Sequence, residues 1–196
     1  DRDVIKDQIR NILTGFGLDE TVGSGMAHPR RMLEIDPDLD PIKITNSISD
    51  EFGVMRTRIL YSLVLTAGNN IRHRNVDFKL FELGKVYLRT KKGFVEPMRC
   101  GLVLAGRSSA MYWQQPPSEG DLYELKGIVG GLMNALKVKD VSITPATIAG
   151  YTKNQTYKIF SGDALLGTMG LIDAKIARRF DVKQACYAAE IDIEAV

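Results

Sequence analysis

The sequence predicts an α+β fold in which an antiparallel sheet is flanked by helices. Several strand-like segments are joined by short polar turns, which favours antiparallel pairing. Amphipathic helical segments separate these groups of strands. The chain has 196 residues, of which 44% are hydrophobic, and no linker-like stretch divides it. We therefore expect residues 1–196 to form a single domain. The chain opens on a helical pattern without a methionine, so we also expect a fragment of a longer protein.

The N-terminal third predicts two amphipathic helices with short strands between them. In the first helix, Ile5, Ile9, Ile12 and Leu13 recur at helical spacing. Thr57 is the expected cap of the second long helix. The expected elements are a helix over 4–16, a strand over 18–22, a short helix over 29–35, an acidic loop over 36–41, a strand over 42–45 and a helix over 59–71.

The centre of the chain predicts a β-hairpin that begins with a strand over residues 77–90. Phe78, Leu80 and Glu82 fall on one side of an extended chain. Phe81 and Leu83 fall on the other side, so the strand is expected to be buried on at least one face. The polar residues 91–93 then form a turn, and the return strand begins at residue 94.

The C-terminal half alternates strands with two more helices. The loop over residues 107–120 contains Trp113, which has two interpretations, a cover over a pocket or a packing anchor. Gly127, Gly130 and Gly131 predict close packing of their helix against the sheet. The expected elements are a strand over 98–104, a helix over 121–136, a strand over 141–144, a hairpin of 156–160 with 164–169, a helix over 174–180 and a strand over 185–193.

Composition and motif searches exclude several classes of function. With 26 basic and 24 acidic residues, the chain has no strong electrostatic case for nucleic-acid binding. Cys100 and Cys186 stand far apart in apolar runs, so we expect two buried thiols, as suits a reducing cytoplasm. The two histidines and two cysteines have no metal-site spacing. We expect no membrane span and no signal peptide. The sequence lacks a Walker A loop, a Gly-x-Ser-x-Gly elbow and a dinucleotide fingerprint.

Five segments carry the pattern of one family: Asn46–Thr57, Phe78–Tyr87, Asp121–Gly127, Gly167–Gly170 and Tyr187–Ile193. Taken together and in order, they resemble bacterial phenylalanyl-tRNA synthetase β chains. The resemblance implies the fold of class II aminoacyl-tRNA synthetases. The first helix and the following strand then resemble motif 1, which builds the subunit interface in that class. Ile5, Ile9, Ile12 and Leu13 are therefore candidate interface residues, with intradomain core as the alternative.

The segment that resembles motif 2 departs from the pattern of active members. Those members hold the α-phosphate of ATP with an arginine in an aromatic-Arg-x-acid run. Here the run is Tyr87, Leu88, Arg89 and Thr90, so a leucine replaces the arginine and a threonine the acid. Arg89 is one residue out of phase and is expected on the other face of the strand. Residues 190–194 carry acids where motif 3 needs a phosphate-binding arginine. We expect no catalytic residue, cofactor or metal in this domain.

The resemblance implies a cytoplasmic, non-catalytic structural core that pairs with the catalytic α subunit. The α2β2 enzyme would attach phenylalanine to tRNA, using ATP and Mg²⁺. One alternative is a divergent adenylate-forming enzyme, such as a biotin-ligase relative, with Arg56 or Arg89 as the phosphate ligand. A second alternative is a tRNA-binding module. Its candidate phosphate contacts are Arg72, His73, Arg74, Lys91, Lys92, Arg178 and Arg179.

Overall fold

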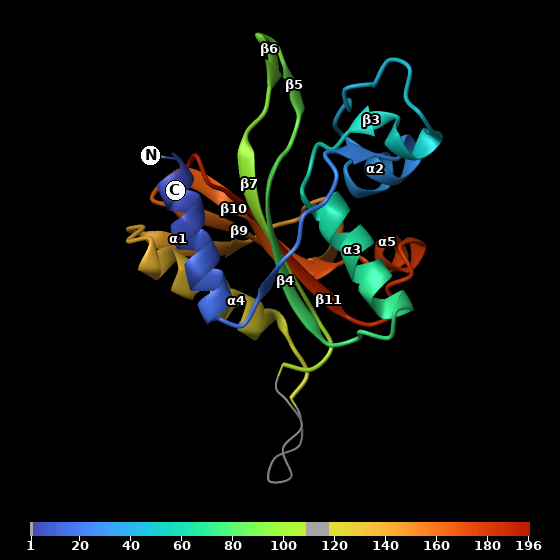
Figure 1. Ribbon diagram of the computed structural model, residues 1–196. Helices are drawn as coiled ribbons and strands as arrows, with labels where there is room; N and C mark the ends of the chain where they lie inside the picture. Colours follow the sequence, from blue (N-terminus) through green and yellow to red (C-terminus); the bar gives the residue numbers. More distant parts are fainter. Residues whose placement is uncertain (1, 109–117) are drawn as a thin grey trace.

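A computed structural model describes residues 2–108 and 118–196 and shows one large sheet with helices on both faces (Figure 1). Within these residues the sheet has seven strands, in the order β1-β4-β7-β11-β10-β9-β8. Every neighbouring pair is antiparallel except β1 with β4. The strands are β1 (Asp19–Glu20), β4 (Phe78–Lys85), β7 (Met98–Ala105), β8 (Val141–Pro145), β9 (Tyr151–Ser161), β10 (Ala164–Ile172) and β11 (Cys186–Asp192).

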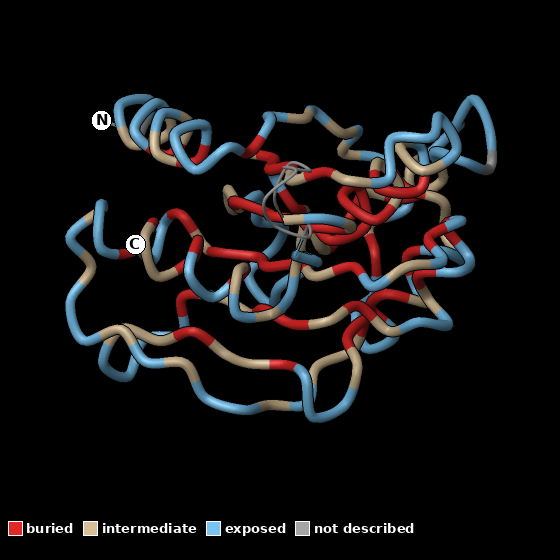
Figure 2. The backbone as a smooth tube through the Cα atoms, turned by 90° about the horizontal axis from the view of Figure 1, so that it is seen from below, coloured by how far each residue is buried: buried red, intermediate tan, exposed pale blue. Residues whose placement is uncertain are grey.

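The helices divide into two groups that cover opposite faces of the sheet (Figure 1). One face is covered by α1 (Arg2–Gly15) and α4 (Leu122–Ala135), and the other by α2 (Pro29–Ile35), α3 (Leu60–Arg72) and α5 (Ala174–Arg179). Each interface holds its own hydrophobic core, here called the α4-side core and the α3-side core. Figure 2 shows the buried positions concentrated along the central strands. The sheet therefore separates two independent layers of packing.

Side-chain alternation along β4 confirms the interpretation of the central strand. Phe78 and Leu80 lie in the α3-side core, and Phe81 lies in the α4-side core. Glu82 follows the same alternation and is buried. A carboxylate therefore enters the α3 side of the sheet at the level of the first turn of α3.

The predicted hairpin extends beyond the large sheet as a separate two-stranded ribbon. Its strands are β5 (Leu88–Thr90) and β6 (Gly93–Val95). The expected strand over 77–90 is interrupted, because the Tyr87 backbone N–H donates to the Arg56 carbonyl, 2.9 Å away, rather than to a strand. Figure 1 shows the β5–β6 ribbon projecting from the body of the molecule.

Several predicted elements differ from the structure. Residues 42–45 form no strand within the described chain, only a bridge from Lys43 to Val54 beside the small β2 (Met26–Ala27) and β3 (Val54–Met55) pair. The prediction that Thr57 caps α3 was wrong, because its hydroxyl donates instead to Asp36 Oδ2, 2.9 Å away. Residues 50–52 form a 3-10 helix. Trp113 lies outside the described residues.

The glycines of α4 do not pack against the sheet as predicted. A Cβ on Gly131 would lie 2.6 Å from Phe16 Cζ, so this glycine admits the ring at the end of α1. A Cβ on Gly127 or Gly130 would meet no atom within 4 Å. The helix therefore needs a small residue toward α1, and its other two glycines face open space.

Candidate functional site

The candidate site is a cavity of about 330 Å³ beside β5, here called the β5 cavity. It opens on the α3 side of the sheet, where β10 and β11 lie across from β5. Its apolar lining includes Leu39, Val86, Leu88, Ile148 and Leu165. Its charged lining consists of Asp36, Arg58, Arg99, Glu190 and Asp192.

The four residues of the predicted motif 2 segment take different positions around this cavity. Leu88 lines the β5 cavity and packs against the α3-side core. Arg89 is not among the lining residues; its Nε lies 3.3 Å from Asp40 Oδ2. Thr90 Oγ1 donates to the Gly93 carbonyl in the ribbon turn, and the Tyr87 backbone holds the segment against Arg56. Of these four residues, only Leu88 lines the β5 cavity, and its side chain is uncharged.

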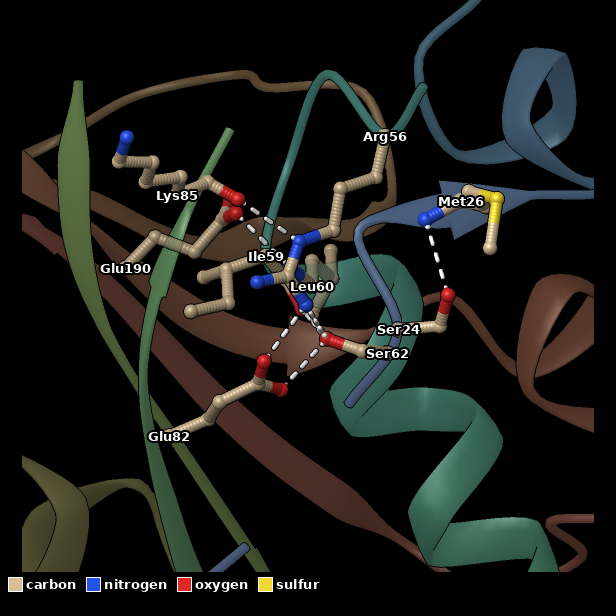
Figure 3. A network of polar contacts seen from close by, with 9 residues as sticks. All are labelled: Ser24, Met26, Arg56, Ile59, Leu60, Ser62, Glu82, Lys85 and Glu190. Atoms are coloured by element: carbon tan, nitrogen blue, oxygen red, sulfur yellow. Dashed lines mark hydrogen bonds and ion pairs between the residues drawn. The ribbon is translucent and has the colours of Figure 1, made fainter. Parts of the chain in front are cut away.

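Arg56 is buried in a polar network rather than open to a ligand (Figure 3). Its Nη1 donates to Glu82 Oε1 at 2.6 Å and to Ser62 Oγ at 2.7 Å, and its Nε donates to the Lys85 carbonyl at 2.9 Å. The side chains of Arg56 and Glu82 are only 3% and 2% exposed. A Cβ on Gly84 would overlap the Arg56 guanidinium, so a glycine is required there. Arg56 therefore fixes the start of α3 to β4.

Arg58 forms a second buried pair two residues further along the chain. Its Nε donates to Glu190 Oε2 at 2.7 Å, its Nη2 donates to the same oxygen, and its Nη1 donates to the Ala149 carbonyl at 2.6 Å. The guanidinium also lies 5.3 Å from the centre of the Tyr151 ring. Burial is the largest single influence and lowers the pKa of Arg58, but Glu190, Tyr151 and Asp36 together raise this pKa above its ordinary value.

Glu190 also supplies the cap that α3 lacks in its own sequence. Ile59 occupies the N-cap position and has no side-chain hydrogen bond to offer. Glu190 Oε1 instead accepts from the Leu60 backbone N–H at 2.9 Å, which satisfies one of the free donors at the helix N-terminus. Between the two carboxylates, Gly101 pairs with both Glu82 and Glu190. A Cβ on Gly101 would lie 2.6 Å from Leu63 Cδ1, so the glycine admits α3 to the sheet.

Both arginines that line the β5 cavity are already paired with carboxylates. Arg58 is paired with Glu190, and Arg99 is paired with Asp192. Asp36 is a third lining carboxylate, and burial raises its pKa. The lining thus holds three acidic and two basic side chains, a balance that opposes binding of a polyphosphate. Sequence inspection identified the acids of residues 190–194 but missed the arginines that neutralise Glu190 and Asp192.

Comparison with known proteins identifies the family of the chain. The family model described as the phenylalanyl tRNA synthetase beta chain CLM domain matches residues 1–193. The chain belongs to this family. It is 29% identical to the phenylalanine–tRNA ligase beta subunit of Syntrophotalea carbinolica, over 95% of this chain and 24% of that protein. The corresponding subunit of Clostridium acetobutylicum is 30% identical, over 97% of the chain and 24% of that protein. The chain therefore spans about a quarter of the length of these relatives.

Solved structures confirm the predicted class II synthetase-like fold of this CLM domain. A structure of PylSc from Desulfitobacterium hafniense, described as a pyrrolysyl tRNA synthetase, superposes with a TM-score of 0.74 at 12% identity. The superposed region covers 97% of this chain and 65% of the PylSc chain. A second structure of the pyrrolysyl-tRNA synthetase from the same organism gives a TM-score of 0.76. At this identity the likeness establishes the fold alone.

The candidate interface residues of the CLM domain lie mostly inside it. Ile9 and Leu13 are buried in the α4-side core, and Ile5 and Ile12 pack against that core while remaining partly exposed. Val4 of α1 has 53% of its surface accessible, and Phe16, which follows the end of α1, has 42%. The solvent-facing side of α1 therefore combines apolar and charged residues.

The seven basic residues considered for tRNA contact do not form one surface. The end of α3 carries Arg72, His73 and Arg74, and α5 carries Arg178 and Arg179. Lys91 and Lys92 lie instead at the tip of the β5–β6 ribbon, on the opposite side of the molecule in Figure 1. Several members are already engaged, since Arg72 pairs with Asp181 and Arg179 with Glu34. The ribbon lysines are thus a separate group.

The described residues show neither a metal-binding cluster nor a membrane span. Among them, no group of three or more His, Cys, Asp or Glu side chains is arranged to hold a metal ion. No described helix is long and apolar enough to cross a bilayer. The cysteines are free and buried as predicted.

Proposed function

We propose that this CLM domain is a non-catalytic structural core of a phenylalanyl-tRNA synthetase β subunit. It pairs with the catalytic α subunit and helps to position that subunit's active site, while the α2β2 enzyme attaches phenylalanine to tRNA in the cytoplasm. ATP and Mg²⁺ serve the whole enzyme and not this domain. The observation that carries the proposal is the β5 cavity, where Leu88 projects inward and both lining arginines are paired with carboxylates.

The geometry gives an active adenylate-forming site little support. Adenylation needs a fixed positive charge at the phosphate, and that charge acts most strongly where water is excluded. Arg56 is buried against Glu82, and Arg89 lies outside the cavity lining. Arg56 and Arg89, the two phosphate ligands considered for an adenylate-forming enzyme, therefore do not line the β5 cavity.

The test combines nucleotide binding with pyrophosphate exchange on the purified chain. We expect no heat of ATP binding by calorimetry and no phenylalanine-dependent exchange. Phenylalanine-dependent exchange, or ATP binding that Arg89→Met abolishes, would contradict the proposal. Pairing is tested separately by co-expressing the β chain with the α subunit and measuring the mass of the purified complex.

A further inference from the structure

The segment around the β5–β6 ribbon has a clear excess of basic over acidic residues, although the chain as a whole is nearly balanced. Residues 85–96 contain four basic residues and one acidic residue, whereas the whole chain has a formal net charge of only +2. This one segment therefore carries a larger excess of basic over acidic residues than the entire protein. The rest of the molecule is close to neutral or slightly acidic, so the overall charge conceals a local basic surface.

The shape of the ribbon presents this charge to a partner. Residues 89–96 are all exposed, and Figure 1 shows the ribbon standing clear of the sheet and helices. Asp40 and Glu96 engage Arg89 and Lys85. Among the described residues, no ion pair or hydrogen bond involves the side-chain ammonium of Lys91 or Lys92. The tip of the β5–β6 ribbon therefore carries two lysine side chains that have no ion-pair partner among the described residues.

An exposed aromatic ring lies next to these cations. Phe94 has 61% of its surface accessible, more than any other phenylalanine of the chain. The Arg89 guanidinium lies 5.1 Å from the centre of the Phe94 ring, which holds the ring in place. An ordered aromatic surface between cations matches the chemistry of RNA, whose bases stack on rings and whose phosphates attract lysines.

We propose that the tip of the β5–β6 ribbon binds RNA, with Lys91 and Lys92 contacting phosphates and Phe94 stacking on a base. An acidic protein would satisfy the lysines but gives no reason for the exposed, arginine-backed ring. The natural RNA would be the tRNA of the enzyme, and in that respect the inference rests on the proposed function. It assigns the domain a direct contact that structural pairing alone does not require.

A photo-crosslinking experiment tests which macromolecule meets the ribbon. The β chain carrying Phe94→p-benzoylphenylalanine is assembled with the α subunit, mixed with labelled tRNA and irradiated. A Tyr123→p-benzoylphenylalanine chain is the matched control, since Tyr123 is an exposed aromatic residue (81% accessible) on α4. We expect an RNA adduct from position 94 and none from position 123. An adduct to protein alone, or no adduct at position 94, would overturn the proposal.

A charge experiment tests the phosphate contacts on the same complex. Replacing both ribbon lysines by glutamine should weaken tRNA binding about threefold to tenfold near 0.1 M salt and reduce the slope of log K against log salt by about 1–2. Lys137→Gln with Lys139→Gln is the control, because these two exposed lysines lie between α4 and β8. Equal effects of the two double variants, or no effect of the first, would count against the ribbon.

The two proposals fail in different ways. A chain that never assembles with the α subunit contradicts the proposed function, and crosslinking and salt titration are then carried out on the chain alone. A complex that assembles normally but shows no ribbon effect contradicts only the RNA contact.

Discussion

At the scale of single residues, the buried pair of Arg56 and Glu82 should contribute little to net stability and yet be costly to break. Two charges with 3% and 2% exposed side chains lose most of their hydration, and their attraction only offsets that loss. Removing one partner leaves the other charge buried without compensation. We therefore expect Arg56→Met to lower the free energy of unfolding by about 3–5 kcal/mol, as measured by urea denaturation.

Two comparisons make this prediction specific. The double variant Arg56→Met with Glu82→Leu removes both charges and should recover much of the loss. Glu96→Gln breaks the half-exposed pair with Lys85 and should change stability by no more than about 1 kcal/mol. If the double variant is as unstable as Arg56→Met alone, the network stabilises the fold by more than the pairing of these two charges.

The two cysteines give a prediction with a defined pH dependence. Burial raises the pKa of Cys100 and of Cys186 to about 12, above the ordinary value of 9.0. In the unfolded chain both thiols lose their protons near pH 9, while in the folded chain they keep them. Stability should therefore fall as the pH rises from about 9 toward 12. A Cys100→Ala, Cys186→Ala variant should show a shallower decline in urea midpoints over that range.

The same burial predicts that neither thiol reacts while the chain is folded. A thiol-labelling reagent at pH 8 should modify both cysteines rapidly in urea and modify the folded chain only as fast as it opens. Rapid native labelling at either position would show a local opening of β7 or β11.

Residue burial was easier to predict than residue pairing. The alternation of β4 placed Glu82 on the face of Phe78 and Leu80 from sequence alone. The partners could not be predicted in the same way, because Arg58 and Glu190 lie 132 residues apart and meet only through the strand order. Motif inspection therefore missed the main polar contacts of the domain.

At the scale of elements, glycines show how closely the helices approach their neighbours. A Cβ on Gly68 of α3 would overlap the carbonyl oxygen of Phe180 at the end of α5, whereas a Cβ on Gly130 of α4 would meet nothing within 4 Å. Both glycines lie inside helices, where alanine is intrinsically better by about 0.5–1 kcal/mol.

The same substitution should therefore have opposite effects at these two positions. Gly130→Ala should raise the free energy of unfolding by about 0.5–1 kcal/mol. Gly68→Ala should lower it by about 2 kcal/mol or more, because a backbone carbonyl cannot move aside as a flexible side chain can. Thermal or urea unfolding of the two variants measures both effects, and a stabilising Gly68→Ala would contradict the close packing of α3 on α5.

Local pattern predicted the helices well, including the short α2 and α5, but wrongly predicted a strand over residues 42–45. The amphipathic repeats of α1, α3 and α4 extend over several turns and were placed within a few residues. The expected strand over 42–45 has only four residues, and its surroundings allow a single bridge. The interruption between β4 and β5 depends on a hydrogen bond from Tyr87 to Arg56, a contact between segments that no local pattern specifies.

At the scale of the whole molecule, the sheet separates two kinds of surface. On the α3 side, three arginines are paired with carboxylates, Arg56 with Glu82, Arg58 with Glu190 and Arg99 with Asp192. On the α4 side, α1 and α4 form a layer whose outer face has small and apolar positions, among them Val4, Gly127 and Gly130. Open space over two glycines allows another helix to approach closely, so the α4 side is the better candidate for subunit pairing.

This assignment predicts that a charge on the outer face of α1 disrupts the complex without unfolding the chain. Val4→Asp places a carboxylate in the first turn of α1, where the helix dipole favours it, so folding stability should hardly change. In a packed interface the same carboxylate would be desolvated without a partner, and affinity for the α subunit should fall at least about tenfold. Ile48→Asp is the control, since Ile48 is 99% exposed and lies in the loop before β3. Sedimentation of the mixed subunits measures both. Equal affinities for the two variants would move the pairing surface away from α1, and weakening by Ile48→Asp alone would assign it to the α2–β3 region.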